Sequence, residues 1–350
     1  MTPRERVEAA LRGERVDQVP FTIYHNMLPR GRRERHLREL GLGLCVRTDV
    51  VRRRCPNVEV ETRTVEQDGR TVIHERVRTP VGDVTARRTP GGGYGTTVTI
   101  EHYIKRPRDY KVIEFWVRDT VCEPAYDDFR RIAEEIGDDG YVMTQIGYSP
   151  LMEMLVRYLG LEQFSIDMVE HPDEFFGLYE RLNEHRRSLY EIAANSPSPV
   201  VLYCGNVHPE ILGAERFGTY VVPCYNEAAD VLHARGKIMG VHLDADNRVF
   251  APAVARSKID LVEAFTPPPD CDMTVAEARH AWPDKTLWIN FPSSVHLAPP
   301  DRIRQVTREI LDQAAGWNRF LIGVTEDIPQ NVVLQSLTAI AETIRERRTS

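Results

Sequence analysis

The chain has 350 residues, of which 42% are hydrophobic and 28% are charged, and its formal net charge at pH 7 is −7. This composition is that of a globular protein with an ample core, and the acidic balance argues against broad nucleic-acid binding, which needs a basic face. No apolar run approaches the ~20 residues that span a bilayer, so we expect no membrane segment.

The amino terminus and the cysteines indicate a cytoplasmic protein. The first residues, Met1 to Arg6, are polar and helix-forming and lack the apolar core of a secretory signal. The six cysteines are scattered without a CxxC pair, which is typical of reduced thiols and not of a disulfide framework.

The first 105 residues combine one helix, two buried strands and a β-rich excursion. Residues 2–12 predict a helix that ends at Gly13, and the apolar runs 19–24 and 44–50 predict strands. From about 57 to 105 the polar and apolar residues alternate and are interrupted by turns such as Gln67-Asp68-Gly69. We expect antiparallel hairpins there.

Beyond residue 106 short apolar runs alternate with amphipathic stretches. The runs are 141–146, 200–203, 238–243, 259–264, 286–290 and 320–324. The clearest helical stretches are 175–192, 223–233, 302–315 and 332–345. Strands that are apolar on both faces and separated by helices form parallel sheets. Together with 19–24 and 44–50 they predict a closed α/β (β/α)8 TIM barrel, as a single domain over 1–350 that contains the 57–105 excursion.

Polar and titratable side chains follow almost every predicted strand. They include His25, Tyr148, Asn206, His208, His242, Asp244, Asn290, Ser293 and Glu326. The carboxyl ends of barrel strands converge at one face, where TIM-barrel enzymes hold their active sites. Loop starts are polar in any protein, but this set is rich in His, Asn, Asp and Glu and has no lysine, which favours a functional interpretation.

The strongest local signal is the segment from Gly240 to Asn247. Side chains at positions i and i+2 of a strand point the same way, so His242 and Asp244 can reach one ion. Glu326, or in second place Glu263, could complete a site for Zn²⁺, Mn²⁺ or Fe²⁺. Alternatively, Asp246 and Asn247 cap the next helix, and His242 is a hydrogen-bonded residue of the pocket.

Five segments spread along the chain form a family-like pattern. They are Arg4-Glu5-Arg6-Val7, Thr79-Pro80-Val81-Gly82, Gly147-Tyr148-Ser149-Pro150, His233-Ala234-Arg235-Gly236-Lys237 and the strand that ends at His242. Together they resemble the uroporphyrinogen decarboxylase superfamily, which includes the decarboxylase and zinc-dependent methyltransferases acting on methylcobamides and coenzyme M. The resemblance extends over nearly the whole chain and implies a TIM barrel.

The differences from that superfamily concern the metal ligands. The methyltransferases carry His-x-Cys and a late second Cys, whereas this chain has His242, Asp244 and, at or beside the late position, Glu326. Tyr148 falls where the decarboxylase has its active-site tyrosine.

Three functions are compatible with these residues. The first is metal-assisted methyl transfer on a small-molecule substrate, with zinc as the foremost metal and a corrinoid, or a corrinoid protein, as a candidate methyl donor or acceptor. In it His242, Asp244 and Glu326 hold the metal, and His242, Asp244 and Tyr148 are the catalytic residues. Substrate binding is assigned to Asn206, His208, Asn290, Ser293, His25 and Phe265.

The second function is decarboxylase or lyase chemistry without a metal, in which Arg30 and the histidines hold a carboxylated substrate. The third is a non-catalytic corrinoid-binding barrel, which does not explain the titratable residues at the strand ends.

Overall fold

The computed structural model describes residues 1–91, 96–205 and 207–347. By its internal contacts the chain divides into two compact units. The first comprises Met1–Asp49, Tyr126–Gln145 and Pro197–Ser350, and the second comprises Val50–Ala125 and Ile146–Ser196.

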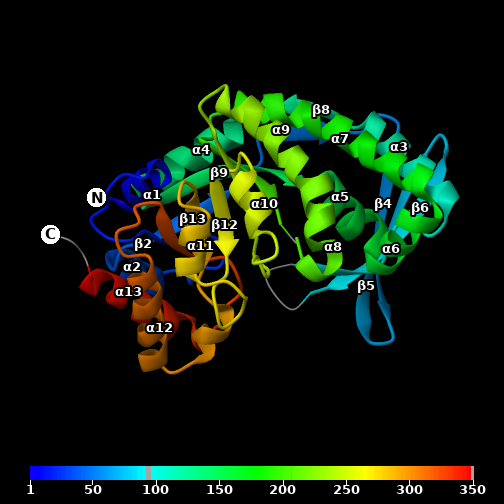
Figure 1. The fold of residues 1–350 in the computed structure, drawn as a ribbon. Helices are drawn as coiled ribbons and strands as arrows, with labels where there is room; N and C mark the ends of the chain where they lie inside the picture. The colour runs from blue at the N-terminus through cyan, green and yellow to red at the C-terminus, as the bar shows by residue number, and fades with distance from the viewer. Residues whose placement is uncertain (92–95, 206, 348–350) are drawn as a thin grey trace. The chain divides into compact units, whose positions relative to one another are not determined.

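The first unit contains a closed parallel barrel (Figure 1). Its strands are β1 (Phe21–Tyr24), β2 (Leu42–Arg47), β9 (Gly140–Tyr148), β10 (Val200–Cys204), β11 (Ile238–His242), β12 (Leu261–Phe265), β13 (Thr286–Asn290) and β14 (Phe320–Val324). They neighbour one another in the order β1-β14-β13-β12-β11-β10-β9-β2, and β2 pairs with β1 to close the ring. The predicted (β/α)8 barrel is confirmed, and β2 is its eighth strand.

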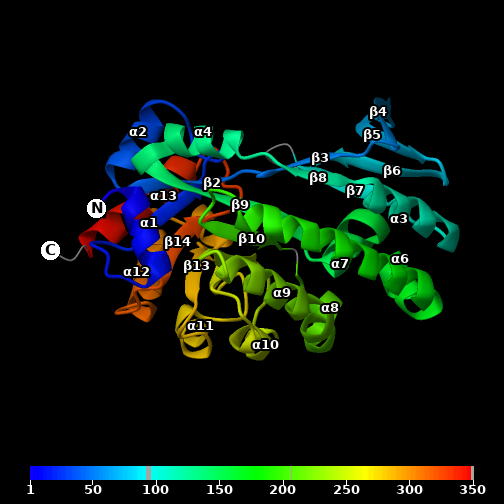
Figure 2. The same ribbon diagram turned by 90° about the horizontal axis from the view of Figure 1, so that it is seen from above.

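Helices of the first unit surround these strands (Figures 1 and 2). They are α1 (Pro3–Arg12), α2 (Arg32–Glu39), α4 (Asp127–Ile136), α8 (Pro209–Arg216), α9 (Val222–His233), α10 (Ala251–Arg256), α11 (Val275–Ala281), α12 (Pro300–Gln313) and α13 (Val333–Glu346). The predicted helices at 223–233, 302–315 and 332–345 agree with α9, α12 and α13 to within two residues. An apolar stripe at helical spacing therefore located them correctly.

Helix α1 closes the amino-terminal end of the barrel. Thr2 and Glu5 form a reciprocal capping box that starts the helix, and Gly13, with φ 75°, ends it in the left-handed region that glycine adopts readily. Val7 and Leu11 of this helix join a buried cluster that includes Trp288 inside the barrel. The carboxyl ends of the strands lie at the opposite end.

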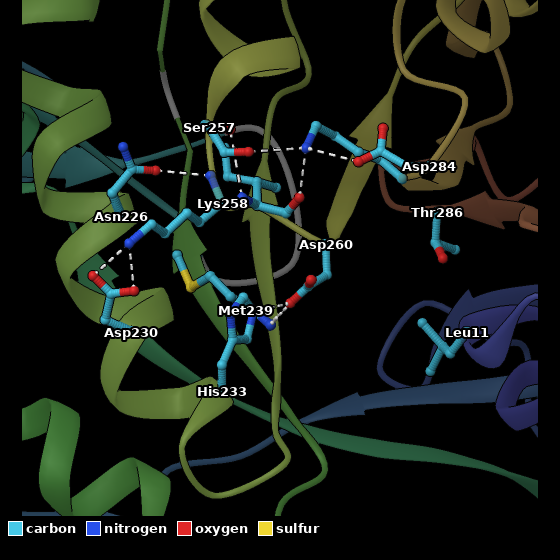
Figure 3. Close-up of polar contacts among 12 residues, drawn as sticks. Leu11, Asn226, Asp230, His233, Met239, Ser257, Lys258, Asp260, Asp284 and Thr286 are labelled. Atoms are coloured by element: carbon cyan, nitrogen blue, oxygen red, sulfur yellow. Dashed lines mark hydrogen bonds and ion pairs between the residues drawn. The ribbon is translucent and has the colours of Figure 1, made fainter.

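Polar contacts tie together the segments that enter β11, β12 and β13 (Figure 3). The ammonium of Lys285, which is 3% exposed, donates to the carbonyls of Ser257 at 3.1 Å and Ile259 at 2.8 Å. The carboxylate of Asp260 accepts a hydrogen bond from the Met239 amide at 2.7 Å. These contacts satisfy buried backbone groups at the amino-terminal end, where residues of a TIM barrel serve stability.

The second unit contains the β-rich excursion. The strands β4 (Glu59–Gln67), β5 (Arg70–Thr79), β6 (Gly82–Pro90) and β7 (Thr97–Glu101) form an antiparallel sheet in that order, and β3 (Val51–Arg54) pairs with β8 (Val121–Pro124). The helices are α3 (Tyr110–Asp119), α5 (Pro150–Glu153), α6 (Gly160–Glu170) and α7 (Pro172–Ala194). In Figure 2, β3 and β8 run side by side. The predicted antiparallel hairpins are confirmed.

Among the described residues, no helix combines the length and the apolarity needed to cross a membrane. All six cysteines are free thiols.

Candidate active site

Polar side chains gather at the carboxyl ends of the barrel strands. Glu263 lies two residues after Leu261, and Asn290 lies two residues after Trp288; both apolar residues belong to the cluster inside the barrel. Because alternate residues of a strand face the same side, Glu263 and Asn290 form a polar layer that lies above this apolar cluster, toward the carboxyl ends of the strands. This layer lies where TIM-barrel enzymes bind their substrates.

Glu263 is the centre of this layer. Its side chain has no exposed surface, and each of its carboxylate oxygens has a partner. The hydroxyl of Tyr24 donates to Oε1 at 2.5 Å, and Nδ1 of His242 lies 2.5 Å from Oε2. Residues from β1, β11 and β12 are thereby joined through one buried carboxylate.

The pair formed by His242 and Glu263 is charged. Burial alone would lower the pKa of His242, but the carboxylates of Glu263 and Asp244 outweigh it and raise that pKa to about 10. Burial would raise the pKa of Glu263, yet the imidazolium beside it holds that pKa below its ordinary value. At neutral pH the imidazole therefore carries a proton on both nitrogens.

A β-bulge in β12 places the neighbours of Glu263. The register with β13 shifts between Glu263 and Phe265, and Ala264 between them has φ 60°, in the left-handed region. Phe265 is fully buried and packs edge-to-face on Trp282, with ring centroids 5.9 Å apart. The bulge therefore turns Phe265 into the protein interior, and this ring, which we expected to contact substrate, supports the strand instead.

Asp244 lies on the other side of His242. Its Oδ2 is 3.4 Å from Nε2 of His242, and its side chain is 27% exposed, so it faces an accessible space. The side-chain amide of Asn247 donates through Nδ2 to the backbone carbonyls of Leu243 at 3.1 Å and Ala245 at 2.7 Å. Asn247 thus shapes the loop that presents Asp244, whereas α10 begins only at Ala251.

Glu326 follows β14 and interacts electrostatically with this pair. Burial and the charge of Asp244 raise its pKa above the ordinary value, although the charge of His242 opposes the rise. Within residues 1–91, 96–205 and 207–347, no three His, Cys, Asp or Glu side chains are already arranged around a common point at ligand distance. His242 and Asp244 are brought together as the sequence predicted, and Glu326 acts on them through its charge.

Asn290 is largely engaged in holding the backbone. It is 2% exposed, and its Oδ1 accepts a hydrogen bond from the amide of Thr325 at 2.9 Å. Its Nδ2 lies 3.4 Å from the Thr266 hydroxyl and 3.5 Å from the Ser293 hydroxyl. Asn290 and Ser293 therefore link the loops after β12, β13 and β14.

The remaining predicted residues are placed differently. His208, at the start of α8, has a buried Nδ1 without a hydrogen-bond partner among the described residues. Burial would raise the pKa of Asp244, but His242 chiefly and His208 in addition hold it below its ordinary value. His25 follows β1 and is half-buried, and burial and Arg30 lower its pKa. Asn206 lies outside the described residues, and Tyr148 ends β9 within the second unit.

Sequence reasoning missed one residue of this layer, Arg47, and considered Glu263 in another role. Arg47 ends β2, and its guanidinium carbon lies 4.1 Å from the centroid of the Tyr24 ring. The only signal was a cation inside the apolar run 44–50. Glu263 was considered as a second-choice metal ligand, but its oxygens bond to His242 and Tyr24.

Residues 92–347 match the family model described as Uroporphyrinogen decarboxylase (URO-D). Among curated proteins, none matches the chain.

Two solved structures match the chain at low sequence identity. A methyltransferase from Methanosarcina mazei superposes with a TM-score of 0.60 at 13% identity and covers 99% of both chains. An endo-1,4-beta-mannanase from Rhizomucor miehei reaches a TM-score of 0.40 at 10% identity, over 93% of this chain and 94% of that one. The likeness to the methyltransferase shows a common fold.

Proposed function

Because the chain belongs to the uroporphyrinogen decarboxylase family, we propose that it is an enzyme that transfers a methyl group between a small-molecule substrate and an acceptor, assisted by a divalent metal ion. The methyltransferase from Methanosarcina mazei, which has the same fold along its whole length, supports this kind of reaction. The observation that carries the metal proposal is the spacing of His242 and Asp244.

Nε2 of His242 and Oδ2 of Asp244 are 3.4 Å apart. A hydrogen bond between charged groups is normally shorter, about 2.7–2.9 Å. Tetrahedral zinc holds nitrogen and oxygen ligands at about 2.0–2.2 Å, so two ligand atoms on one ion lie roughly 3.3–3.5 Å apart. The two side chains thus have the spacing of neighbouring ligands.

The residues behind the pair support the same assignment. Metal-binding histidines commonly donate their second N–H to a carboxylate, as His242 does to Glu263. Glu326 would be the third ligand, and zinc the foremost metal ahead of Mn²⁺ and Fe²⁺. When bound, such an ion supplies Lewis acidity that lowers the pKa of an acceptor thiol or water.

Side chains of the protein would accept and donate the protons of the transfer. In the transfer the acceptor X–H loses its proton and gains the methyl group, while the donor keeps the electron pair of the broken bond. Burial and Asp244 raise the pKa of Glu326 above its ordinary value, which makes this carboxylate a stronger base for that proton when it is not bound to the metal. A methylated corrinoid, free or held by a partner protein, would be the donor in this scheme. A corrinoid acceptor would carry no proton to lose, and the leaving group of the methyl donor would then take a proton from Tyr148. His208 would orient the substrate.

Metal analysis tests this proposal. Protein purified without a histidine tag is stripped with a chelator, titrated with Zn²⁺, Mn²⁺ and Fe²⁺, and analysed for bound metal. We expect one ion per chain, lost in His242→Ala and reduced in Asp244→Asn, but retained in His280→Ala, which removes an exposed histidine of α11. Equal metal binding by the wild type and His242→Ala would overturn the metal assignment.

A second function, decarboxylation without a metal, is favoured by the protonation of His242. An imidazolium with a pKa of about 10 can protonate the carbanion left when a carboxylated substrate loses CO2. A protein that binds no metal, yet releases CO2 from such a substrate only with His242 intact, would support this route. Corrinoid binding that is unaffected by His242→Ala, with no turnover, would indicate a binding protein.

A further inference from the structure

Arg47 has an unusual environment. Its guanidinium is half-buried at the carboxyl end of β2 and lies over the ring of Tyr24, with 4.1 Å between the guanidinium carbon and the ring centroid. Among the described residues it makes neither a hydrogen bond nor an ion pair. Its five N–H groups are therefore available to a ligand.

The position of the guanidinium is fixed from below. The Tyr24 hydroxyl donates to the buried Glu263 at 2.5 Å, which holds the ring, and the ring in turn supports Arg47. A guanidinium stacked on an aromatic ring keeps its in-plane N–H donors free. The Tyr24 ring thus supports the guanidinium of Arg47 from one side.

Neutralising Glu263 does not explain this arrangement. Both oxygens of Glu263 already have partners, Tyr24 and His242, and Arg47 is not within ion-pair distance of it. The charge of Arg47 still lowers the pKa of Glu263 from a distance. This electrostatic effect does not require the N–H groups of Arg47 to be without hydrogen-bond acceptors. A partly buried cation without hydrogen bonds is costly, and an anionic ligand would remove that cost.

We propose that Arg47 binds a carboxylate group of the substrate. Two parallel N–H donors of a guanidinium match the two oxygens of a carboxylate, a geometry that a compact ammonium cannot reproduce. The contacts from Arg47 through Tyr24 and Glu263 to His242 are continuous, so the carboxylate would lie beside the His242–Asp244 pair. The identity of the bound group as substrate rests on the proposed function, whereas the anion site itself does not.

Binding of acetate tests the site. Metal-free protein is titrated with ¹³C-labelled acetate at constant ionic strength, and binding is followed by NMR line broadening, with acetamide as the uncharged analogue. We expect saturable acetate binding, no acetamide binding, at least tenfold weaker acetate binding in Arg47→Met, and intermediate binding in Arg47→Lys. Arg304→Met, which removes a surface arginine of α12, should bind acetate as the wild type does.

Each outcome separates the two proposals. Acetate binding that depends on Arg47 in chelator-treated protein supports the carboxylate site even if metal binding fails. Acetate binding that disappears in His242→Ala and persists in Arg47→Met would overturn it, as would equal binding of acetate and acetamide. If circular dichroism shows that Arg47→Met does not fold, Arg47→Lys provides the test. Unchanged acetate affinity in Arg47→Lys would mean that the two parallel N–H donors of the guanidinium do not bind the carboxylate, and would overturn the proposal.

Discussion

Nδ1 of His242 lies 2.5 Å from a carboxylate oxygen of Glu263, a side chain with no exposed surface. A buried carboxylate persists only when it is paired and hydrogen-bonded, and Glu263 satisfies both oxygens through His242 and Tyr24. The pair therefore fixes the orientation of the imidazole and directs Nε2 toward Asp244. A histidine held in this way is prepared either to bind a cation or to donate a proton.

Replacing Glu263 by glutamine should weaken metal binding. The amide can accept from Tyr24 through its oxygen and then offers N–H to Nδ1, which forces the imidazole proton onto Nε2, the atom that would bind the metal. We expect zinc affinity to fall about 10–100-fold, measured by competition with a chelator.

Tyr24→Phe is the matched control for this variant, since it removes one hydrogen bond and leaves the carboxylate. It should lower zinc affinity less than Glu263→Gln does. Unchanged affinity in Glu263→Gln would show that the carboxylate does not orient His242 for a metal.

The bulge at Ala264 should respond to the size of its side chain. Alanine at φ 60° is strained, and the left-handed region costs an L-residue roughly 1–2 kcal/mol. Ala264→Gly should therefore raise the free energy of unfolding, or leave it unchanged once glycine's greater freedom in the unfolded chain is counted. Ala264→Val should lower it by more than about 1 kcal/mol and disturb Glu263.

Chemical denaturation measures both changes. The matched control is Ala278→Gly within α11, where the backbone is helical and glycine costs about 1 kcal/mol. If Ala264→Gly were as destabilising as Ala278→Gly, the left-handed conformation of Ala264 would not hold.

His296 should make stability depend on pH. Burial lowers its pKa to about 4, although Asp270 opposes the shift, and its Nδ1 pairs with the Ser336 hydroxyl at 2.7 Å. Between pH 6.5 and about 4 the unfolded chain binds a proton that the folded chain does not. The free energy of unfolding should therefore decrease as the pH is lowered through this range, by up to about 3 kcal/mol from this group.

Urea unfolding at pH 7, 5.5 and 4.5 checks this dependence. His296→Gln should flatten it, whereas His280→Gln, at an exposed position of α11, should keep it. Parallel pH profiles for the wild type and His296→Gln would contradict the lowered pKa.

Lys285 should contribute to stability and not to the reaction. Its substitution by methionine leaves the buried carbonyls of Ser257 and Ile259 without their donor, which should cost about 1–3 kcal/mol. Metal uptake should be unchanged, because these contacts lie at the amino-terminal end of the barrel.

Lys258→Met is the comparison for that variant, because Lys258 forms an exposed ion pair with Asp230 (Figure 3). Its effect on unfolding should stay within about 1 kcal/mol. A similar loss for both lysines would mean that burial of Lys285 does not matter.

The sequence by itself determined the barrel and the proximity of His242 and Asp244. Strands that are buried on both faces read as short apolar runs, and helices that cover them show a 3.6-residue stripe, so both kinds of element can be located from local pattern. The spacing of two residues between His242 and Asp244 at a strand end places them on one side through backbone geometry alone.

Only the tertiary structure decided the partners of those residues. That Glu263 faces His242 and Tyr24 depends on the register of β11 against β12 and on the pairing of β1 with β14, which sequence neighbours do not encode. The bulge at Ala264 and the position of Arg47 over the Tyr24 ring arise from contacts between strands, and the one sequence signal for either was the cation inside the apolar run 44–50. Several polar side chains follow the strands, and the sequence does not distinguish which of them become partners. Hydrogen bonds and packing between distant segments determine those partners.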